Sequence, residues 1–201
     1  MADLAERLRS ALSARGRPSS DYDLNPDVQL PPERTLRSAA VLIPVISRPA
    51  NASVILTKRS SALKHHPGQI AFPGGKVDEK DNGAVDAALR EAREEIGLDR
   101  RDSDVLGALP PHETVTGFQV TPVLALVRPD FKASPEPGEV AEAFEVPLEH
   151  VMNPGRFLIE SRRWRGKRRF YFVVPWGPYY IWGATARILR ALADRMQNGE
   201  P

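Results

Sequence analysis

Residues 90–98 read Arg90-Glu91-Ala92-Arg93-Glu94-Glu95-Ile96-Gly97-Leu98. At about 100° per residue, the three glutamates fall within roughly one third of a helix, and apolar side chains cluster about 120° away. That apolar set comprises Val85, Ala88, Leu89, Ala92 and Ile96. Three neighbouring carboxylates repel one another unless a hard divalent cation shares their oxygens. The stretch predicts a helix with a core face and a magnesium or manganese site, although a solvated charged face would have the same pattern.

A glycine segment, Phe72-Pro73-Gly74-Gly75, precedes this helix. Glycines let the backbone approach a metal ion or a phosphate closely, and the proline stiffens the entry to the loop. Gly97 is typical of the C-terminal stop of a helix over Asn82–Leu98. A Gly-Gly pair alone is usually a turn, but the loop, the acidic helix and the stop in this order favour a ligand site.

The rest of the chain alternates between strand and helix patterns. Strands are expected at Ala39–Ile46, Ser53–Thr57, Val105–Leu109, Val120–Val127 and Glu142–Pro147, with a further hairpin over Arg156–Val174 that turns at Arg165-Gly166-Lys167. Helices are expected at Ala2–Ala14, with the stripe Leu4, Leu8 and Leu12, and at Ile181–Met196, with the face Ile188, Leu189, Leu192 and Met196. Gly16–Glu33 has no apolar period and reads as a connection. These patterns predict an α/β or α+β protein.

Length and composition favour one domain, because 201 residues with 41% hydrophobic residues can bury a substantial core. We expect an N-terminal helix and connection over residues 1–36, a main domain over 37–196 and a tail over 197–201. The net charge of +2 gives little attraction to nucleic acid or anionic membranes. The sequence has no cysteine, which excludes disulfides, thiolate zinc sites and cysteine nucleophiles.

A cytoplasmic location is the best interpretation, since no apolar run reaches the ~20 residues that cross a bilayer and Met1–Ser20 lacks a secretory pattern. The arginines near the N-terminus leave a mitochondrial transit peptide open, but Asp3 and Glu6 argue against it. We therefore expect no membrane partner and no nucleic-acid partner. The sequence leaves a monomer and a homodimer equally open.

The acidic helix and its glycine loop resemble the Nudix box, Gly-x5-Glu-x7-Arg-Glu-U-x-Glu-Glu-x-Gly-U, in which U is a bulky aliphatic residue. Here Asp81 replaces the first glutamate, one extra residue follows it, and Ala92 is small at the first U position. The resemblance implies an α/β/α sandwich with a mixed sheet and hydrolysis of a diphosphate joined to another group. It also implies metal binding by Glu91 and Glu95, with help from Glu94 and the Gly75 carbonyl, and leaves the role of Asp81 open. Arg90 could hold one of these carboxylates in place.

The segment Ile55–Gly75 resembles the coenzyme A pyrophosphatase signature, Leu-Leu-Thr-x-Arg-Ser-x3-Arg-x3-Gly-x3-Phe-Pro-Gly-Gly, from which Ile55 and Lys64 depart. Leu109–Val123 and Ile181–Ala186 are also similar to this subfamily. The resemblance implies a small-molecule substrate, coenzyme A or a derivative, cleaved to 3′,5′-ADP and 4′-phosphopantetheine or its acyl form. The predicted substrate-binding residues are Arg59, Lys64, His66, Gly74 and Gly75, because cationic and amide donors suit phosphates. A surface turn is the alternative for Arg59 and the histidines.

The base that activates water is expected in the loop before the strand near Phe144, where family architecture places a carboxylate. Glu113, Glu139, Glu142 and Glu145 are the candidates outside the box. We predict Glu139, with Glu94 and Arg90 as further catalytic residues; a box glutamate could also serve as the base.

Several alternatives stay open at this point. A Nudix hydrolase of NADH or ADP-ribose would have the same box, and a non-catalytic nucleotide or RNA binder could share the fold. The basic run Arg162–Arg169 contains Trp164, so it suits an exposed hairpin tip, a phosphate contact or a nucleic-acid surface. The loop Pro110-Pro111-His112 could be a substrate wall or a rigid connection.

Overall fold

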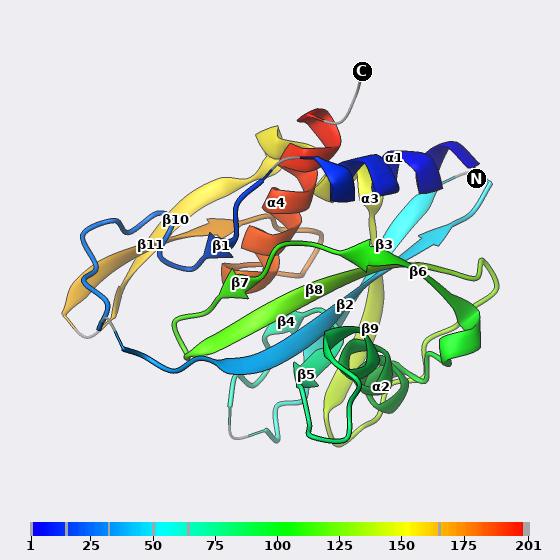
Figure 1. The fold of residues 1–201 in the computed structure, drawn as a ribbon, viewed down its shortest axis with the longest axis horizontal. Coiled ribbons are helices and arrows are strands. Elements are labelled where there is room, and N and C mark those ends of the chain that lie inside the picture. The colour runs from blue at the N-terminus through cyan, green and yellow to red at the C-terminus, as the bar shows by residue number, and fades with distance from the viewer. Residues whose placement is uncertain are drawn as a thin grey trace.

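The computed structural model describes residues 2–14, 16–31, 33–49, 51–63, 65–164 and 166–198. A large mixed sheet runs through it, with helices on both sides (Figure 1). The helices are α1 Ala2–Ser13, α2 Ala84–Ile96, α3 Leu148–Val151 and α4 Gly183–Asn198, with 3-10 turns η1 Arg100–Asp102 and η2 Pro154–Arg156. The strands are β1 Ser19–Ser20, β2 Arg37–Ser47, β3 Ala52–Arg59, β4 Ile70–Ala71, β5 Gly74–Lys76, β6 Ser103–Ala108, β7 His112–Glu113, β8 Phe118–Val127, β9 Val140–Pro147, β10 Leu158–Trp164 and β11 Lys167–Val173.

The sheet is mixed because its central strand, β2, has neighbours of both directions. β2 runs parallel to β8, from Arg37 opposite Phe118 to Ile46 opposite Val127, and antiparallel to β3. The strand order is β1-β7-β8-β2-β3-β4, and β5 pairs with β2, β6 with β8 and β9 with β3. The predicted hairpin of the first two long strands is therefore confirmed.

Two hydrophobic cores lie on the two sides of this sheet. Successive side chains of a strand point to opposite faces, so β2 contributes Ile43 and Val45 to one core and Leu42 and Ile46 to the other. The first core packs under α1, α3 and α4, and the second packs under α2. A strand buried on both faces reads as an almost continuous apolar run, as β2 does. The predicted α/β/α sandwich with a mixed sheet is confirmed.

Helix α1 packs against α4 and β6 at the outer side of the first core. Leu8 is fully buried, and Leu4 and Leu12 pack beside it, as the stripe predicted. Arg195 in α4 donates from Nη1 to the carbonyl oxygens of Ala11, at 3.3 Å, and Ala14, at 2.6 Å. The first and last helices are thus joined by a buried cation that satisfies the carbonyl end of α1.

The predicted connection over residues 16–33 is bonded to the body of the sheet. Its short strand β1 runs parallel to β7, with Ser19 opposite His112. Asp23 accepts an ion pair at 2.6 Å from Arg187 in α4. The predicted boundary at residue 36 stays a prediction. No helix in the described ranges is long and apolar enough to cross a membrane.

Strands β10 and β11 form a separate two-stranded sheet beside α4, which confirms the predicted hairpin (Figure 1). Trp164 lies opposite Lys167 at its end, and Arg165 falls outside the described residues, as does the predicted substrate residue Lys64. The predicted apolar face of α4 is buried, and it consists of Ile188, Leu189, Leu192 and Met196.

Candidate active site

Helix α2 carries the acidic residues, and two glycines set its ends. Gly83 precedes the first turn with φ 98°, and Gly97 follows the last turn in the left-handed conformation with φ 71°. The Gly97 N–H donates to the Arg93 carbonyl at 3.0 Å, so the predicted stop is confirmed. The core face is buried against β2, which fixes the rotation of the helix and hence the direction of its glutamates.

Glu95 is the most buried of the three glutamates, with 3% of its surface exposed. Its Oε2 accepts a 3.3 Å hydrogen bond from the Gly74 N–H. Burial raises the pKa of Glu95 to about 8, and the nearby charge of Glu91 adds to the rise. Burial also raises the pKa of Glu91, which Arg90 partly offsets. The two carboxyl groups therefore form an acidic pair in which Arg90 compensates Glu91, while burial disfavours the charged form of Glu95.

The glycine loop lies directly against this pair. In β5, Gly75 pairs with Ala40 of β2, and the Glu91 carboxylate packs so closely that a Cβ at position 75 would collide with it. A Cβ at Gly74 would collide with the Ala40 carbonyl oxygen. Close packing against backbone requires glycine at position 74, whereas a side chain at position 75 would displace the Glu91 carboxylate. The Gly75 backbone thus lies directly beside Glu91.

Arg90 is the centre of an ion-pair network that joins Glu91 to Asp81, in the loop before α2. Its Nε and Nη2 donate to both oxygens of Asp81 at 2.9 Å, and its Nη1 donates to Glu91 at 2.9 Å. A further hydrogen bond joins Nη2 to the Lys76 carbonyl at 3.1 Å. Arg90 in turn lowers the pKa of Asp81 to about 2. The network fixes Glu91 in position and ties α2 to the loop that precedes it.

Glu94 lies at the outer edge of the acidic face. Its side chain is 54% exposed, and its Oε2 accepts from Arg90 Nη1 at 3.0 Å. The helix therefore orders the three glutamates by depth, with Glu95 inside, Glu91 between and Glu94 outside. Among the described residues, no three acidic or histidine side chains converge tightly enough to hold a metal ion by themselves. Glu91 and Glu95 are the pair that burial brings together.

Glu139 is the external acid that the fold places beside this pair. Its carbonyl oxygen accepts from the Ser60 N–H at 2.8 Å, which fixes it at the end of β3, and its charge raises the pKa values of Glu91 and Glu95. The other three candidates have partners elsewhere: Glu113 binds Arg34, Glu142 binds Tyr179, and Glu145 binds Arg48. Among the four candidates, Glu139 is the one whose charge acts on both Glu91 and Glu95, and its role as the base stays a prediction.

Arg59, the last residue of β3, is half-buried, and its charge acts on Glu95. Its Nε is buried and has no hydrogen-bond partner within the described ranges. Its positive charge favours ionisation of Glu95 and, together with burial, lowers the pKa of His66. The structure thus brings Arg59 between the acidic pair and the loop that carries His66, with an unused donor.

Comparison with known proteins agrees with this arrangement. Residues 36–168 match the family described as NUDIX domain. The chain belongs to the Nudix family. A Cronobacter sakazakii protein named Uncharacterized Nudix hydrolase NudL is 44% identical over 164 residues, which cover 82% of this chain and 84% of that protein. The protein of the same name from Escherichia coli K12 is 43% identical over 157 residues, 78% of this chain and 81% of that one.

Solved structures share the fold. A Nudix hydrolase from M. smegmatis, RenU, superimposes with a TM-score of 0.50 at 26% identity, over 59% of this chain and 75% of that one. A MutT/nudix family protein from Enterococcus faecalis gives a TM-score of 0.54 at 15% identity, over 86% of this chain and 66% of that one. Together with the family match and the NudL relatives, this makes the chain a Nudix hydrolase, an enzyme of pyrophosphate substrates.

The departure of this Nudix box at Asp81 has a physical explanation in the Arg90 network. Asp81 has a shorter side chain than the glutamate of the family pattern, and an extra residue follows it. Even so, both of its oxygens reach Arg90. The Asp81 carboxylate holds the Arg90 guanidinium, and an aspartate at this altered spacing can still make that contact.

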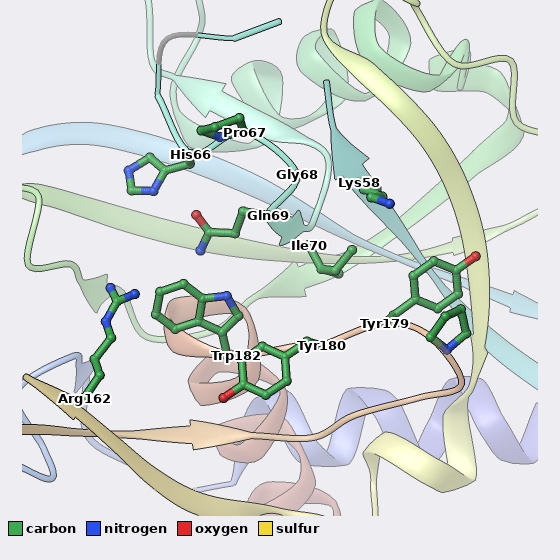
Figure 2. Close-up of a pocket in the computed structure, with 11 residues that line it drawn as sticks. Lys58, His66, Pro67, Gly68, Gln69, Ile70, Arg162, Tyr179, Tyr180 and Trp182 are labelled. Carbon is green, nitrogen blue, oxygen red and sulfur yellow. The ribbon is translucent and has the colours of Figure 1, made fainter. Parts of the chain in front are cut away.

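The Nudix domain also has a pocket that the sequence did not indicate. It has a volume of about 360 Å³ and lies between the loop around His66 and the segment Tyr179–Trp182 (Figure 2). Arg162, from the predicted basic hairpin, also lines it. The sequence of the basic run Arg162–Arg169 does not indicate which of its cations faces a pocket. That depends on how β10 packs against the segment around Trp182, about twenty positions further on.

His112, by contrast, faces the interior. Its ring is fully buried, and its nitrogens lie 2.9 Å from Ser19 Oγ and 3.1 Å from Asp21 Oδ1. Both ring nitrogens are engaged by the N-terminal segment. His112 therefore joins β7 to β1 as part of the fold and has no free atom for a ligand.

Proposed function

We propose that this Nudix hydrolase cleaves the diphosphate of coenzyme A and its derivatives to 3′,5′-ADP and 4′-phosphopantetheine or its acyl form. The observation that carries the proposal is the position of Arg59. It belongs to the Ile55–Gly75 segment that resembles the coenzyme A pyrophosphatase signature, its charge acts on Glu95, and its buried Nε has no partner among the residues that the structure describes. An unsatisfied cationic donor beside an acidic pair suits a phosphate-rich ligand.

Glu91, Glu95 and the Gly75 carbonyl would hold Mg²⁺ or Mn²⁺, with Glu94 as a further oxygen donor. The donor set fits these ions, because two carboxylates with raised pKa values lie against a glycine backbone without enough positive charge. Magnesium is commonly held by one or two carboxylates together with substrate phosphates, so a cage of three protein groups is not required. When bound, the ion would neutralise phosphate oxygens and make the attacking water more acidic.

Glu139 would accept the proton of the attacking water. The water oxygen forms a bond to one phosphorus, the bridging P–O bond breaks, and each product leaves with one phosphate. Glu139 is the acid outside the box whose charge acts on both Glu91 and Glu95. Arg90 would act by holding Glu91 and Glu94, because its guanidinium binds both carboxylates.

Arg59, His66 and Lys64 would bind the substrate phosphates, together with the backbone of Gly74 and Gly75. Arg59 presents a planar pair of donors that fits phosphate oxygens. Lys64 keeps the positive charge of the signature arginine but not its forked geometry.

The test is to incubate the pure protein with coenzyme A and either Mg²⁺ or Mn²⁺ and to identify the products by chromatography and mass spectrometry. We expect 3′,5′-ADP and 4′-phosphopantetheine in equal amounts, and ¹⁸O-labelled water should place the label in the product whose phosphorus is attacked. NADH and ADP-ribose at matched concentrations serve as competing substrates. No turnover of coenzyme A with either metal, or a higher kcat/KM for NADH or ADP-ribose, would overturn the substrate assignment.

A further inference from the structure

The pocket beside the proposed diphosphate site combines aromatic and cationic groups. Trp182 and Tyr180 form one wall, and His66 and Arg162 lie at one end (Figure 2). The Arg162 guanidinium lies 4.3 Å from the centre of the Trp182 ring, and it makes no hydrogen bond within the described ranges. Arg162 is exposed, and no carboxylate of the described residues pairs with it. An aromatic wall next to such a cation suits a ligand that has both a flat ring and an anionic group.

The aromatic wall is held in place from outside the pocket. Tyr171 contacts the edge of Trp182 with the ring centroids 5.2 Å apart. The Tyr180 hydroxyl donates to Glu160 at 2.6 Å, which orients its ring. Rings that are fixed before a ligand arrives lose little freedom on binding. The wall is therefore a preformed stacking surface.

Arg59 connects this pocket to the acidic helix. Its N–H donates to the Gln69 carbonyl at 3.0 Å and its carbonyl accepts from the Gly68 N–H at 3.1 Å, and both of these residues line the pocket. On the other side, its charge acts on Glu95. A ligand whose diphosphate contacts Arg59 would extend one of its two ends into the pocket. For coenzyme A, the choice is between the phosphorylated adenosine and the pantetheine arm.

The chemistry of the pocket favours the adenosine end. The pantetheine arm is neutral and has no ring, so it would leave Arg162 and His66 without an anion and Trp182 without a stacking partner. A volume of about 360 Å³ lies in the range of small-molecule sites. A base needs one flat surface, and a 3′-phosphate needs a cation with further hydrogen-bond donors; the pocket presents Trp182 for the base and Arg162 with His66 for the phosphate.

We infer that this pocket binds a 3′-phosphorylated adenosine, with its base against Trp182 and its 3′-phosphate between Arg162 and His66. The orientation of this end toward Glu95 rests on the proposed function. The inference goes beyond that function, because it makes the 3′-phosphate a specificity element read by the hairpin β10–β11.

The kinetic test compares coenzyme A with 3′-dephospho-coenzyme A in the wild type and in Arg162→Gln. We expect the variant to lower kcat/KM for coenzyme A about tenfold or more, mainly through KM, because it loses a charge-assisted phosphate contact. The kcat/KM of the variant for 3′-dephospho-coenzyme A should stay within about twofold of the wild-type value, since that substrate lacks the 3′-phosphate that Arg162 would bind. Equal losses for both substrates, or no loss for either, would overturn the assignment.

Arg163→Gln is the matched control. It removes the same charge from the next residue of the same strand, and neighbouring side chains of a strand point to opposite faces. It should leave the preference for coenzyme A unchanged. Trp182→Ala should lower kcat/KM about tenfold for both substrates, because stacking of the base does not depend on the 3′-phosphate.

A binding measurement separates this inference from the proposed function. By calorimetry, adenosine 3′,5′-bisphosphate should bind about tenfold more tightly than 5′-AMP, and Arg162→Gln should abolish the difference. If coenzyme A is not cleaved but this difference is found, the proposed function fails and the pocket assignment stands. If coenzyme A is cleaved and the two nucleotides bind equally in the wild type, the pocket assignment fails alone.

Discussion

Arg90 and Arg59 both act on the acidic pair of α2, but they differ in what satisfies them. Arg90 binds Asp81, Glu91 and Glu94, so its guanidinium is surrounded by carboxylates of the chain. Arg59 has a buried Nε for which the described part of the chain offers no acceptor. An unpaired buried nitrogen is not sufficient to mark a binding residue, because Nη2 of Arg195 also lacks a partner among the described residues while its Nη1 caps α1. Arg59 differs in that its charge also acts on Glu95, so the comparison separates a structural network from a proposed binding residue.

Glu95→Gln should lower kcat more than any other substitution, because Glu95 is the deepest proposed metal ligand and no arginine of the described residues forms an ion pair with it. We expect kcat for the preferred diphosphate substrate to fall about 1,000-fold or more. The metal-free melting temperature near neutral pH should not fall, since a pKa raised to about 8 leaves the buried carboxyl largely uncharged and the amide keeps its shape.

Scanning calorimetry with and without Mg²⁺ checks the second half of this prediction. The wild type should gain stability with Mg²⁺ and Glu95→Gln should not. Glu149→Gln, at an exposed position on α3, is the control with the same chemical change. If Glu95→Gln lowered the metal-free melting temperature by several degrees, Glu95 would belong to the structural network instead.

Glu139→Gln should have the second-largest effect and lower kcat about 100-fold. This loss is at the lower end of the range expected when a general base is removed. Glu139 is exposed and its backbone makes the contact to Ser60, so the melting temperature should not change. Single-turnover rates separate a chemical defect from slow product release. Retention of more than half of the wild-type rate would assign the base to another carboxylate.

The direct test of the comparison is to replace each arginine by lysine. Arg59→Lys should lower kcat/KM about tenfold with no loss of stability, because it loses the forked contact to substrate. Arg90→Lys should lower the melting temperature by about 5 °C, because a single ammonium cannot replace the contacts to both oxygens of Asp81. Thermal unfolding and steady-state kinetics on both variants would show whether the two effects separate. A loss of stability in Arg59→Lys as large as that in Arg90→Lys would contradict the distinction.

The smallest effect is expected at an ion pair far from the site. Arg48 binds both oxygens of Glu145 at 2.6 and 2.8 Å, and this hydrogen bonding lowers the pKa of Glu145 below its ordinary value of 4.5. The stabilisation is present above the unfolded pKa and is lost as the pH falls through the lower, folded value. Since both side chains are about one third exposed, Glu145→Gln should cost only about 0.5 kcal/mol near neutral pH. Urea unfolding between pH 3 and about 7 would show the difference between variant and wild type vanish at the acidic end.

The sequence predicted those parts of the molecule in which neighbouring residues decide the outcome. The apolar face of α2, the Gly97 stop and the hairpins depend on local periodicity and turn chemistry, and the structure confirms them. The depth order of Glu91, Glu94 and Glu95 was not predicted, because it depends on how the helix is rotated against β2 and the glycine loop. Asp81 was uncertain since spacing alone does not show that its carboxylate reaches Arg90.

The pocket was missed for a different reason. Arg162 and Trp182 lie far apart in the sequence and come together only when the hairpin packs beside the segment that leads into α4. A basic run gives no sign of which of its members faces inward. The contribution of Arg59 was indicated by the signature around it, but its unpartnered Nε is visible only in three dimensions.

The hydrogen bonds from Arg195 to the end of α1 show that the folded unit extends beyond the stretch of sequence that identifies the family. Residues 36–168 match the family, yet the cap joins Arg195 to carbonyls at residues 11 and 14. A fragment with only the matching residues would lack both halves of the cap, the β1 partner of His112 and the Trp182 wall. The segments before and after the recognised domain therefore pack with it as one unit, and Arg195 is the cation that joins them.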